Sequence, residues 1–139
     1  MTSETHSNYP APRVNADSEP FWKASAQGRF LFKLCQKCGH PHFPPRYLCP
    51  KCWSDRLEWV ESKGKGTVYS LTIMRRAPIP EFAKRVPYVV ALIDLNEGPR
   101  IMANIVGIGA LDVKIGENVS VCFESRAEGM QVPQFQRDL

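Results

Sequence analysis

Two C-x-x-C pairs constrain this chain more than any other feature. The first pair is Cys35 and Cys38, the second is Cys49 and Cys52, and residues 39–48 separate them. Four thiolates at this spacing form a tetrahedral cage, and zinc is the metal ion that suits such a cage. Because four protein ligands leave no position open for water or substrate, we expect one structural Zn²⁺ and no catalytic metal.

Two alternatives to a four-thiolate zinc site stay open. An iron centre of the rubredoxin type uses similar cysteine spacing. His40 and His42 follow the first cysteine pair, and either imidazole could replace a cysteine as ligand. Since the four thiolates already complete the ligand set, we interpret both histidines as exposed loop residues.

Composition indicates a small cytoplasmic protein. The chain has 139 residues, a formal net charge of +4 and five cysteines, of which Cys122 lies outside the two pairs. Thiols in metal-type spacing are typical of a reducing cytosol, where disulfides are rare. The sequence has no apolar run that would span a membrane, and residues 1–15 lack the apolar core of a secretory signal. The mild charge does not favour a nucleic-acid partner.

The N-terminal part predicts an arm, a helix and a zinc ribbon. Residues 1–16 are polar and proline-containing, which predicts a disordered arm. A helix is expected over 18–27, with a polar cap before it and a glycine after it. Strands at 29–34 and 57–60 adjoin the two cysteine pairs and complete the ribbon. We place the domain made of helix and ribbon at 17–61.

The C-terminal part, 62–139, predicts a small β-barrel. Its glycine-rich start, residues 62–66, is expected to be a flexible junction. Five strands with a short insert between the third and the fourth match the plan of an OB-fold, so the chain is mainly β. The segment 88–95 is almost continuously apolar and is expected to be covered on both faces. The five strands are expected at 67–74, 88–95, 101–106, 118–124 and 131–135.

The loop between the cysteine pairs is a candidate docking surface. Its prolines make it stiff, and its aromatic side chains are apolar. It suits either a rigid connector or a surface for a partner protein. The partner-binding candidates are Phe43, Pro44, Pro45, Arg46 and Tyr47.

A second candidate site is basic. Arg75 and Arg76 precede the loop 77–83, and Lys84 and Arg85 follow it. In an OB-fold such a loop borders the ligand face. The four cations could therefore meet the phosphates of coenzyme A or of a nucleic acid, or simply form a solvated loop.

The sequence shows no catalytic constellation. It has no Gly-x-Ser-x-Gly, no His-Glu-x-x-His and no glycine-rich phosphate loop. A nucleophilic role for Cys122 would need a base or a helix N-terminus near its thiol, and nothing local supplies one. We therefore assign no catalytic residue and expect a packed thiol at Cys122.

The order of these features resembles the DUF35 family, in which a rubredoxin-like zinc ribbon precedes an acyl-CoA-associated OB-fold. The similarity runs from about residue 17 to 135. Single C-x-x-C pairs are common, but the ordered series is specific. It includes Phe21-Trp22, Gly28-Arg29-Phe30, Cys35-x-x-Cys38-Gly39, Phe43-Pro44-Pro45-Arg46, Cys49-Pro50-x-Cys52, Gly64-x-Gly66-Thr67-Val68-Tyr69-Ser70 and Pro87-Tyr88-Val89-Val90-Ala91.

The resemblance implies an accessory role. Members of the family associate with thiolase-like and ketosynthase-like enzymes, which carry the catalytic residues. This chain would then be a non-catalytic subunit in acyl or acyl-CoA transfer, with no turnover alone. Such complexes acylate a phloroglucinol-type ring at carbon or degrade an acyl chain by thiolysis. Acyl-CoA or the acyl substrate would lie at the interface.

Two other functions remain as alternatives. An OB-fold can bind single-stranded nucleic acid when aromatic rings line a basic groove, and Tyr69 and Tyr88 are the candidates for base stacking. A stand-alone enzyme would use Cys122 as its nucleophile.

Overall fold

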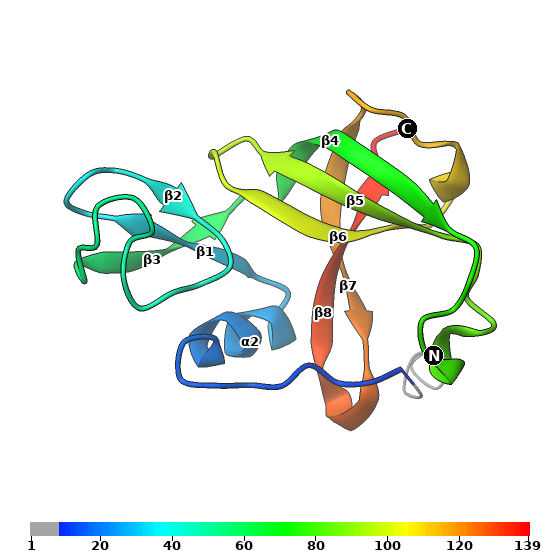
Figure 1. Ribbon diagram of the computed structural model, residues 1–139, viewed down its shortest axis with the longest axis horizontal. Coiled ribbons are helices and arrows are strands. Elements are labelled where there is room, and N and C mark those ends of the chain that lie inside the picture. Colours follow the sequence, from blue (N-terminus) through cyan, green and yellow to red (C-terminus); the bar gives the residue numbers. More distant parts are fainter. Residues whose placement is uncertain (1–8) are drawn as a thin grey trace.

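The computed structural model describes residues 9–139, in which two β units lie side by side with the helix α2 (Glu19–Ala26) below the space between them (Figure 1). The first unit is a three-stranded sheet and the second is a closed barrel. The expected order of helix, ribbon and five-stranded barrel is confirmed. No helix within residues 9–139 has the length and apolar character to span a membrane.

Helix α2 has a proline in its first turn and a glycine after its C-terminal end. Pro20 lies in the first turn, where a missing N–H costs no hydrogen bond. Gly28 follows the helix with φ +74°, a conformation that favours glycine. The helix buries Phe21, Ala24 and Ser25, so this face joins the core.

The ribbon sheet has the strand order β2-β1-β3. Strands β1 (Phe30–Cys35) and β3 (Leu57–Ser62) pair antiparallel along their whole length. The structure adds β2 (Pro41–His42), a short strand that the sequence did not predict, on the other edge of β1. Its pairing places His42 opposite Lys33.

The barrel closes in the order β4-β5-β6-β8-β7. Strand β8 runs parallel to β6 and antiparallel to β7, and β4 pairs with β7 to complete the ring. The expected insert between the third and fourth barrel strands is the short helix η2 (Ala110–Asp112). The other elements are β4 (Lys65–Met74), η1 (Pro80–Phe82), β5 (Tyr88–Leu95), β6 (Arg100–Val106), β7 (Asn118–Ser125), η3 (Ala127–Gly129) and β8 (Gln131–Arg137).

Strand β5 differs from its prediction. Val89, Ala91, Ile93 and Leu95 are buried, whereas the residues between them are only half-buried. The strand therefore faces the barrel core on one side and is not covered on both. The apolar residues of the outer face belong to the barrel surface, which a continuous apolar run cannot reveal.

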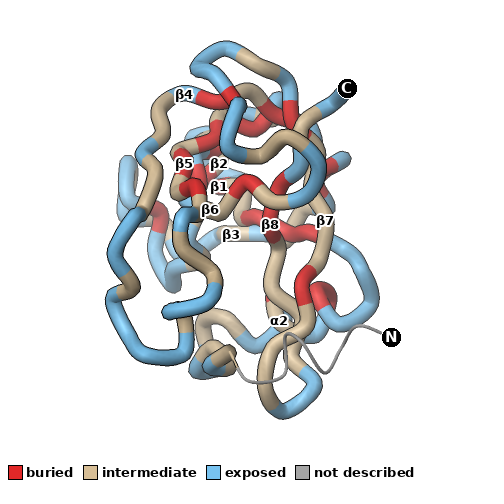
Figure 2. Tube along the Cα trace, turned by 90° about the vertical axis from the view of Figure 1, so that its right-hand side faces the viewer, coloured by how far each residue is buried: buried red, intermediate tan, exposed pale blue. Residues whose placement is uncertain are grey.

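One hydrophobic core joins the helix, the ribbon and the barrel. Phe21 and Phe30 belong to the same buried cluster as Val68 and Phe135. The rings of Phe30 and Phe135 lie 6.1 Å apart, centroid to centroid, so β1 is packed against β8. In Figure 2 the buried residues gather in the strands and the exposed ones in the connecting loops.

The segment from ribbon to barrel is not the flexible junction that its glycines suggested. The Ser62 hydroxyl and the Lys63 N–H donate to the two carboxylate oxygens of Glu97, at 2.9 and 2.8 Å. The Val121 N–H donates to the Gly64 carbonyl at 2.7 Å. A Cβ on Gly64 would lie 2.3 Å from a Val121 methyl carbon, so glycine here permits close packing.

The predicted disordered arm covers residues 1–16, of which 1–8 lie outside the described residues. From Tyr9 onward the chain has defined contacts. The Ala127 N–H donates to the Tyr9 carbonyl at 3.0 Å, and Arg126 donates to the Pro10 carbonyl at 3.1 Å. The Arg85 guanidinium lies 5.0 Å from the centre of the Tyr9 ring.

Candidate functional site

The four predicted ligand cysteines come together at the tip of the ribbon. Their Sγ atoms all lie within 4.8 Å of one another. The Sγ atoms of Cys35 and Cys52 are 3.6 Å apart, and those of Cys38 and Cys49 are 3.7 Å apart. Zn–S bonds of about 2.3 Å in a tetrahedron require S–S separations of about 3.8 Å. The donor set and its geometry therefore fit one zinc ion.

Backbone N–H groups prepare the sulfurs for a cation. The Cys38 N–H lies 3.4 Å from the Cys35 sulfur, and those of Lys51 and Cys52 lie 3.4 Å from the Cys49 sulfur. The Cys38 N–H lowers the pKa of Cys35 to about 6. Such contacts orient metal-bound thiolates and favour their charged form.

Each cysteine pair ends in a left-handed turn residue. Gly39 follows Cys38 with φ +79°, and Trp53 follows Cys52 with φ +68°. Glycine is the usual residue in this conformation, and tryptophan is an uncommon one. Trp53 is 76% exposed. Sequence reasoning missed Trp53, although its place after the second pair matches that of Gly39 after the first.

The predicted docking loop divides into an inner and an outer part. The Phe43 ring packs 5.3 Å from Phe21 and 6.0 Å from Phe30, centroid to centroid. Tyr47 points outward and is 77% exposed. Arg46 is also exposed, and its carbonyl accepts a hydrogen bond from Lys33 at 3.1 Å. Pro44 is exposed and Pro45 is half-buried.

The outer part of this loop joins Trp53 in one exposed apolar patch, made of Tyr47, Leu48 and Trp53, which we call the knuckle surface. All three side chains are among the exposed large hydrophobic residues. A cavity of about 480 Å³ lies among them, bordered by Arg46 and Asp17.

The two histidines do not join the thiol cluster within residues 9–139. His40 and His42 stack with ring centroids 6.2 Å apart. The expectation of two exposed histidines is wrong for His42, which is 5% exposed because β2 pairs with β1. Its Nδ1 lies 3.4 Å from the Pro44 carbonyl, and burial lowers the pKa of the imidazole.

The four basic residues of the second candidate site do not act as one group. Arg75, Arg76 and Lys84 are exposed. Arg85 instead points inward and pairs with Glu124 at 2.6 Å. The loop that carries these residues lies at the end of the barrel remote from the ribbon (Figure 1).

Glu124 is the centre of a buried ionic cluster that sequence reasoning missed. Its carboxylate is 7% exposed and binds Arg85 at 2.6 Å and Arg126 at 3.0 Å. Burial alone would raise the pKa of Glu124, but the two guanidinium groups lower it below its usual value. Gln134 also approaches, with its Nε2 3.4 Å from Glu124. The signal in the sequence was an acid within an apolar strand.

The remaining candidate residues, Cys122, Tyr69 and Tyr88, do not form a common site. Cys122 is half-buried, and burial, with a contribution from Glu124, raises the pKa of its thiol. The Tyr69 ring is covered by the Arg100 guanidinium at 3.5 Å, and the Tyr88 ring packs against Phe82 at 6.0 Å. The two tyrosines therefore do not form a shared stacking platform.

Two family descriptions match this chain in succession. Residues 22–58 match "ChsH2, rubredoxin-like zinc ribbon domain". Residues 59–124 match "ChsH2, C-terminal OB-fold domain". The boundary between the matches falls within β3, so they cover the thiol cluster and most of the barrel.

Relatives in three organisms share this arrangement to different extents. A "DUF35 domain-containing scaffold protein" of Methanothermobacter thermautotrophicus is 37% identical over 97 residues, which is 68% of this chain and 72% of that protein. A "Probable enoyl-CoA hydratase alpha subunit" of Thermomonospora curvata is 35% identical over 91% of this chain and 39% of its own length. The "Benzoylsuccinyl-CoA thiolase subunit BbsA" of Thauera aromatica is 36% identical over 61% of this chain and 59% of its own length.

A solved structure agrees with the fold over nearly the whole chain. It is described as "Ltp2-ChsH2(DUF35) aldolase" and superposes with a TM-score of 0.81 at 33% sequence identity. The superposition covers 93% of this chain and all of the other. The chain spans only part of the hydratase and thiolase subunits that it matches.

Proposed function

We propose, from the premise that this chain belongs to the DUF35 family of zinc-ribbon and OB-fold proteins, that it is a non-catalytic subunit of an enzyme acting on CoA thioesters. Its partner would be a thiolase- or ketosynthase-like protein that carries the catalytic residues. One Zn²⁺ would bind Cys35, Cys38, Cys49 and Cys52 and hold in place the two knuckles, which are the turns at residues 35–39 and 49–53. The ion would supply folding energy to a sheet too small to fold alone.

The observation that carries this proposal is the knuckle surface. Tyr47 and Trp53 are 77% and 76% exposed although both are large and apolar. Tyrosine and tryptophan are enriched among the residues that dominate protein–protein binding energy. The metal cage beside them fixes their backbone, so little conformational entropy is lost when a partner binds.

The names of the relatives support the choice of partner. One relative is named as a subunit of a benzoylsuccinyl-CoA thiolase, and the similar solved structure is described as an aldolase with an Ltp2 component. Both names support the assembly of this domain type with a separate catalytic protein. They favour thiolysis or a related cleavage of an acyl chain over C-acylation of a phloroglucinol-type ring.

The exposed cations are a second part of the proposal. Arg75, Arg76 and Lys84 are exposed and, unlike Arg85, do not pair with Glu124. Their charges therefore suit the phosphates of coenzyme A. Because their loop is remote from the ribbon, such a contact would lie outside the interface formed by the knuckle surface.

The test is co-expression with a thiolase-like protein of the same organism. We expect the two to co-purify and acyl-CoA turnover to require the complex. The double variant Tyr47→Ala/Trp53→Ala should weaken assembly by about tenfold or more while it keeps its zinc and its fold. Tyr69→Ala is the matched control, since Tyr69 is an exposed aromatic residue of the barrel, and it should change affinity by less than about threefold.

Two results would contradict the proposal. The first is acyl-CoA turnover by the isolated chain. The second is a chain that binds none of the organism's thiolase-like proteins at micromolar concentration.

A further inference from the structure

The barrel is open along part of one seam. Strands β6 and β8 pair only at Ile105 with Phe135 and at Val106 with Gln136. The rest of β6, residues 100–104, pairs with β5 alone, and the rest of β8 pairs with β7 alone. Strand pairing therefore stops before these residues, and we call the stretch where 100–104 and 131–134 lie unpaired with each other the fork.

Two residues of β8 explain why the ladder stops. Pro133 has no N–H and cannot donate to β6. The side chain of Gln134 takes the place of a strand bond, since its Oε1 accepts the Asn104 N–H at 2.7 Å. Its Nε2 donates to the Asn104 side chain at 3.2 Å, which fixes the amide in this position.

The fork leaves part of the backbone of β6 without a paired strand on one side. The Leu95 N–H donates to the Pro99 carbonyl, and in an antiparallel ladder the bonded residues alternate. Ile101 and Ala103 thus bond β5, whereas Met102 and Asn104 direct their N–H and C=O away from it. For Asn104 the bond to Gln134 bears this out. Among residues 9–139 no strand is paired with β6 at Met102 on the side away from β5.

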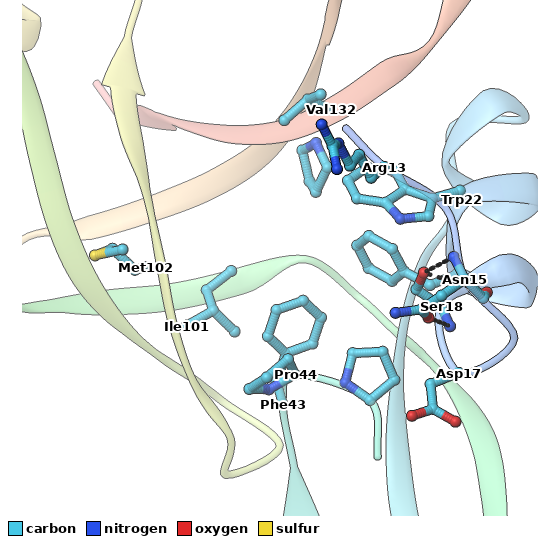
Figure 3. Close-up of a pocket in the computed structure, with 13 residues that line it drawn as sticks. Arg13, Asn15, Asp17, Ser18, Trp22, Phe43, Pro44, Ile101, Met102 and Val132 are labelled. Carbon is cyan, nitrogen blue, oxygen red and sulfur yellow. Dashed lines mark hydrogen bonds between the residues drawn. The ribbon is translucent and has the colours of Figure 1, made fainter. Parts of the chain in front are cut away.

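An apolar cavity of about 490 Å³ adjoins the fork. In Figure 3, Ile101 of β6, Val132 of β8 and Trp22 of α2 surround it from three sides. Phe43 of the ribbon closes it from below in this view. Met102 is 70% exposed, so its side chain lies on the outer surface of the barrel.

The polar groups at the rim of the cavity are largely satisfied by one another. The Ser18 N–H donates to Asn15 Oδ1 at 3.0 Å, and the Asn15 N–H donates to Ser18 Oγ at 3.1 Å. Arg13 and Asp17 also line the cavity and carry opposite charges.

We propose that the fork receives an extended peptide segment of a partner protein, which adds to β6 as a short strand and places an apolar side chain in the cavity. An unpaired N–H and C=O on one residue of a strand edge match the backbone of another strand. An acyl chain would fill the cavity but leave both groups unpaired. The proposal rests on the proposed function only in that the catalytic partner would supply this segment.

The experiment uses the zinc-loaded chain, labelled with ¹⁵N, and the end-blocked peptide Ac-Thr-Val-Leu-Val-Thr-NH₂. We expect saturable shifts of the Met102 and Val132 amide signals at about millimolar peptide, and slower hydrogen exchange of the Met102 amide. The same peptide with its three central nitrogens methylated keeps the side chains and loses the donors. It should not bind.

Variants at one position separate backbone from side-chain recognition. Met102→Pro removes an N–H that the β5 ladder does not use and should weaken the peptide about tenfold or more. Met102→Ala keeps the N–H and should change affinity by less than about threefold. Octanoic acid is the probe for an acyl chain.

Three outcomes would overturn the proposal. They are the absence of shifts at millimolar peptide, equal binding of the methylated peptide, and shifts of these amides by octanoic acid but not by the peptide. The peptide experiment uses the isolated chain. None of these three outcomes therefore decides whether the chain co-purifies with the catalytic partner. Loss of co-purification in the knuckle variants would in turn leave peptide binding intact, so the two failures are distinguishable.

Discussion

At the scale of single residues, Glu124 shows how one carboxylate can hold distant segments together. It contacts Arg85 from the loop between β4 and β5, and Arg126 after β7. Both guanidinium groups also lie near the Tyr9 ring, at 5.0 and 5.9 Å from its centre. The acid therefore pairs with two cations at the point where the N-terminal segment meets the barrel.

Glu124→Gln should destabilise the protein by about 3 kcal/mol. The amide keeps the shape of the side chain but leaves two largely buried guanidinium groups without a counter-charge. Urea unfolding measures the change. Glu128→Gln is the matched control, because Glu128 is exposed and close by, and it should cost less than about 0.5 kcal/mol. Equal effects of the two variants would contradict the importance of the cluster.

The same cluster predicts a pH dependence. Because the pKa of Glu124 is lower in the folded state than in the unfolded state, its stabilising contribution is fully present above the unfolded pKa of about 4.3. It is lost as pH falls through the lowered folded pKa. The difference in unfolding free energy between the wild type and Glu124→Gln should be constant from about pH 8 to pH 5 and shrink below about pH 4. A difference that grows with acid would refute this assignment.

At the scale of elements, we expect the ribbon to depend on metal at one end and on packing at the other. The thiol cluster holds the knuckles, whereas Phe30 at the start of β1 is buried in the shared core. Loss of metal should therefore loosen the tip of the ribbon and leave its base in place.

Zinc removal by a chelator, or Cys49→Ser, should raise amide hydrogen exchange in residues 35–56. Helix α2 and the barrel should keep their protection, because their core does not include the thiols. Native mass spectrometry gives the zinc content and hydrogen-exchange mass spectrometry gives the location. Cys122→Ser is the control and should keep the metal. Unchanged exchange in residues 35–56 after complete zinc loss would mean that the ion does not hold the knuckles.

At the scale of the whole molecule, the glycine after β3 sets how the ribbon meets the barrel. Gly64 has φ +74° and lies against Val121 of β7. Flexible linkers and close contacts both use glycine, so the residue type alone does not distinguish them.

Gly64→Ala should destabilise the protein by about 2–4 kcal/mol, since the new methyl group would overlap Val121 and the backbone would be strained. Gly28→Ala is the matched control, with the same φ of +74° and no atom within 4 Å of the new methyl group. It should cost only the strain, about 1 kcal/mol. Thermal or urea unfolding compares the two. Equal losses would show that Val121 does not restrict this position.

The metal cage and the order of the elements could be predicted because they depend on local patterns. The spacing of Cys35, Cys38, Cys49 and Cys52 predicts a four-thiol cluster without knowledge of the rest of the fold. Alternating apolar residues and turn signals place the helix and the barrel strands within a few residues of their observed bounds. Both signals lie within short stretches of chain.

Only the tertiary structure decided which side chains face the core and which face the solvent. Phe43 and Tyr47 belong to one loop, yet Phe43 packs on α2 and Tyr47 is exposed. Arg85 turns from its basic neighbours because strand register brings Glu124 beside it. The fork exists because Pro133 of β8 lies beside β6 and has no N–H to donate to it. These outcomes depend on pairing between strands far apart in sequence, which spacing along the chain does not encode.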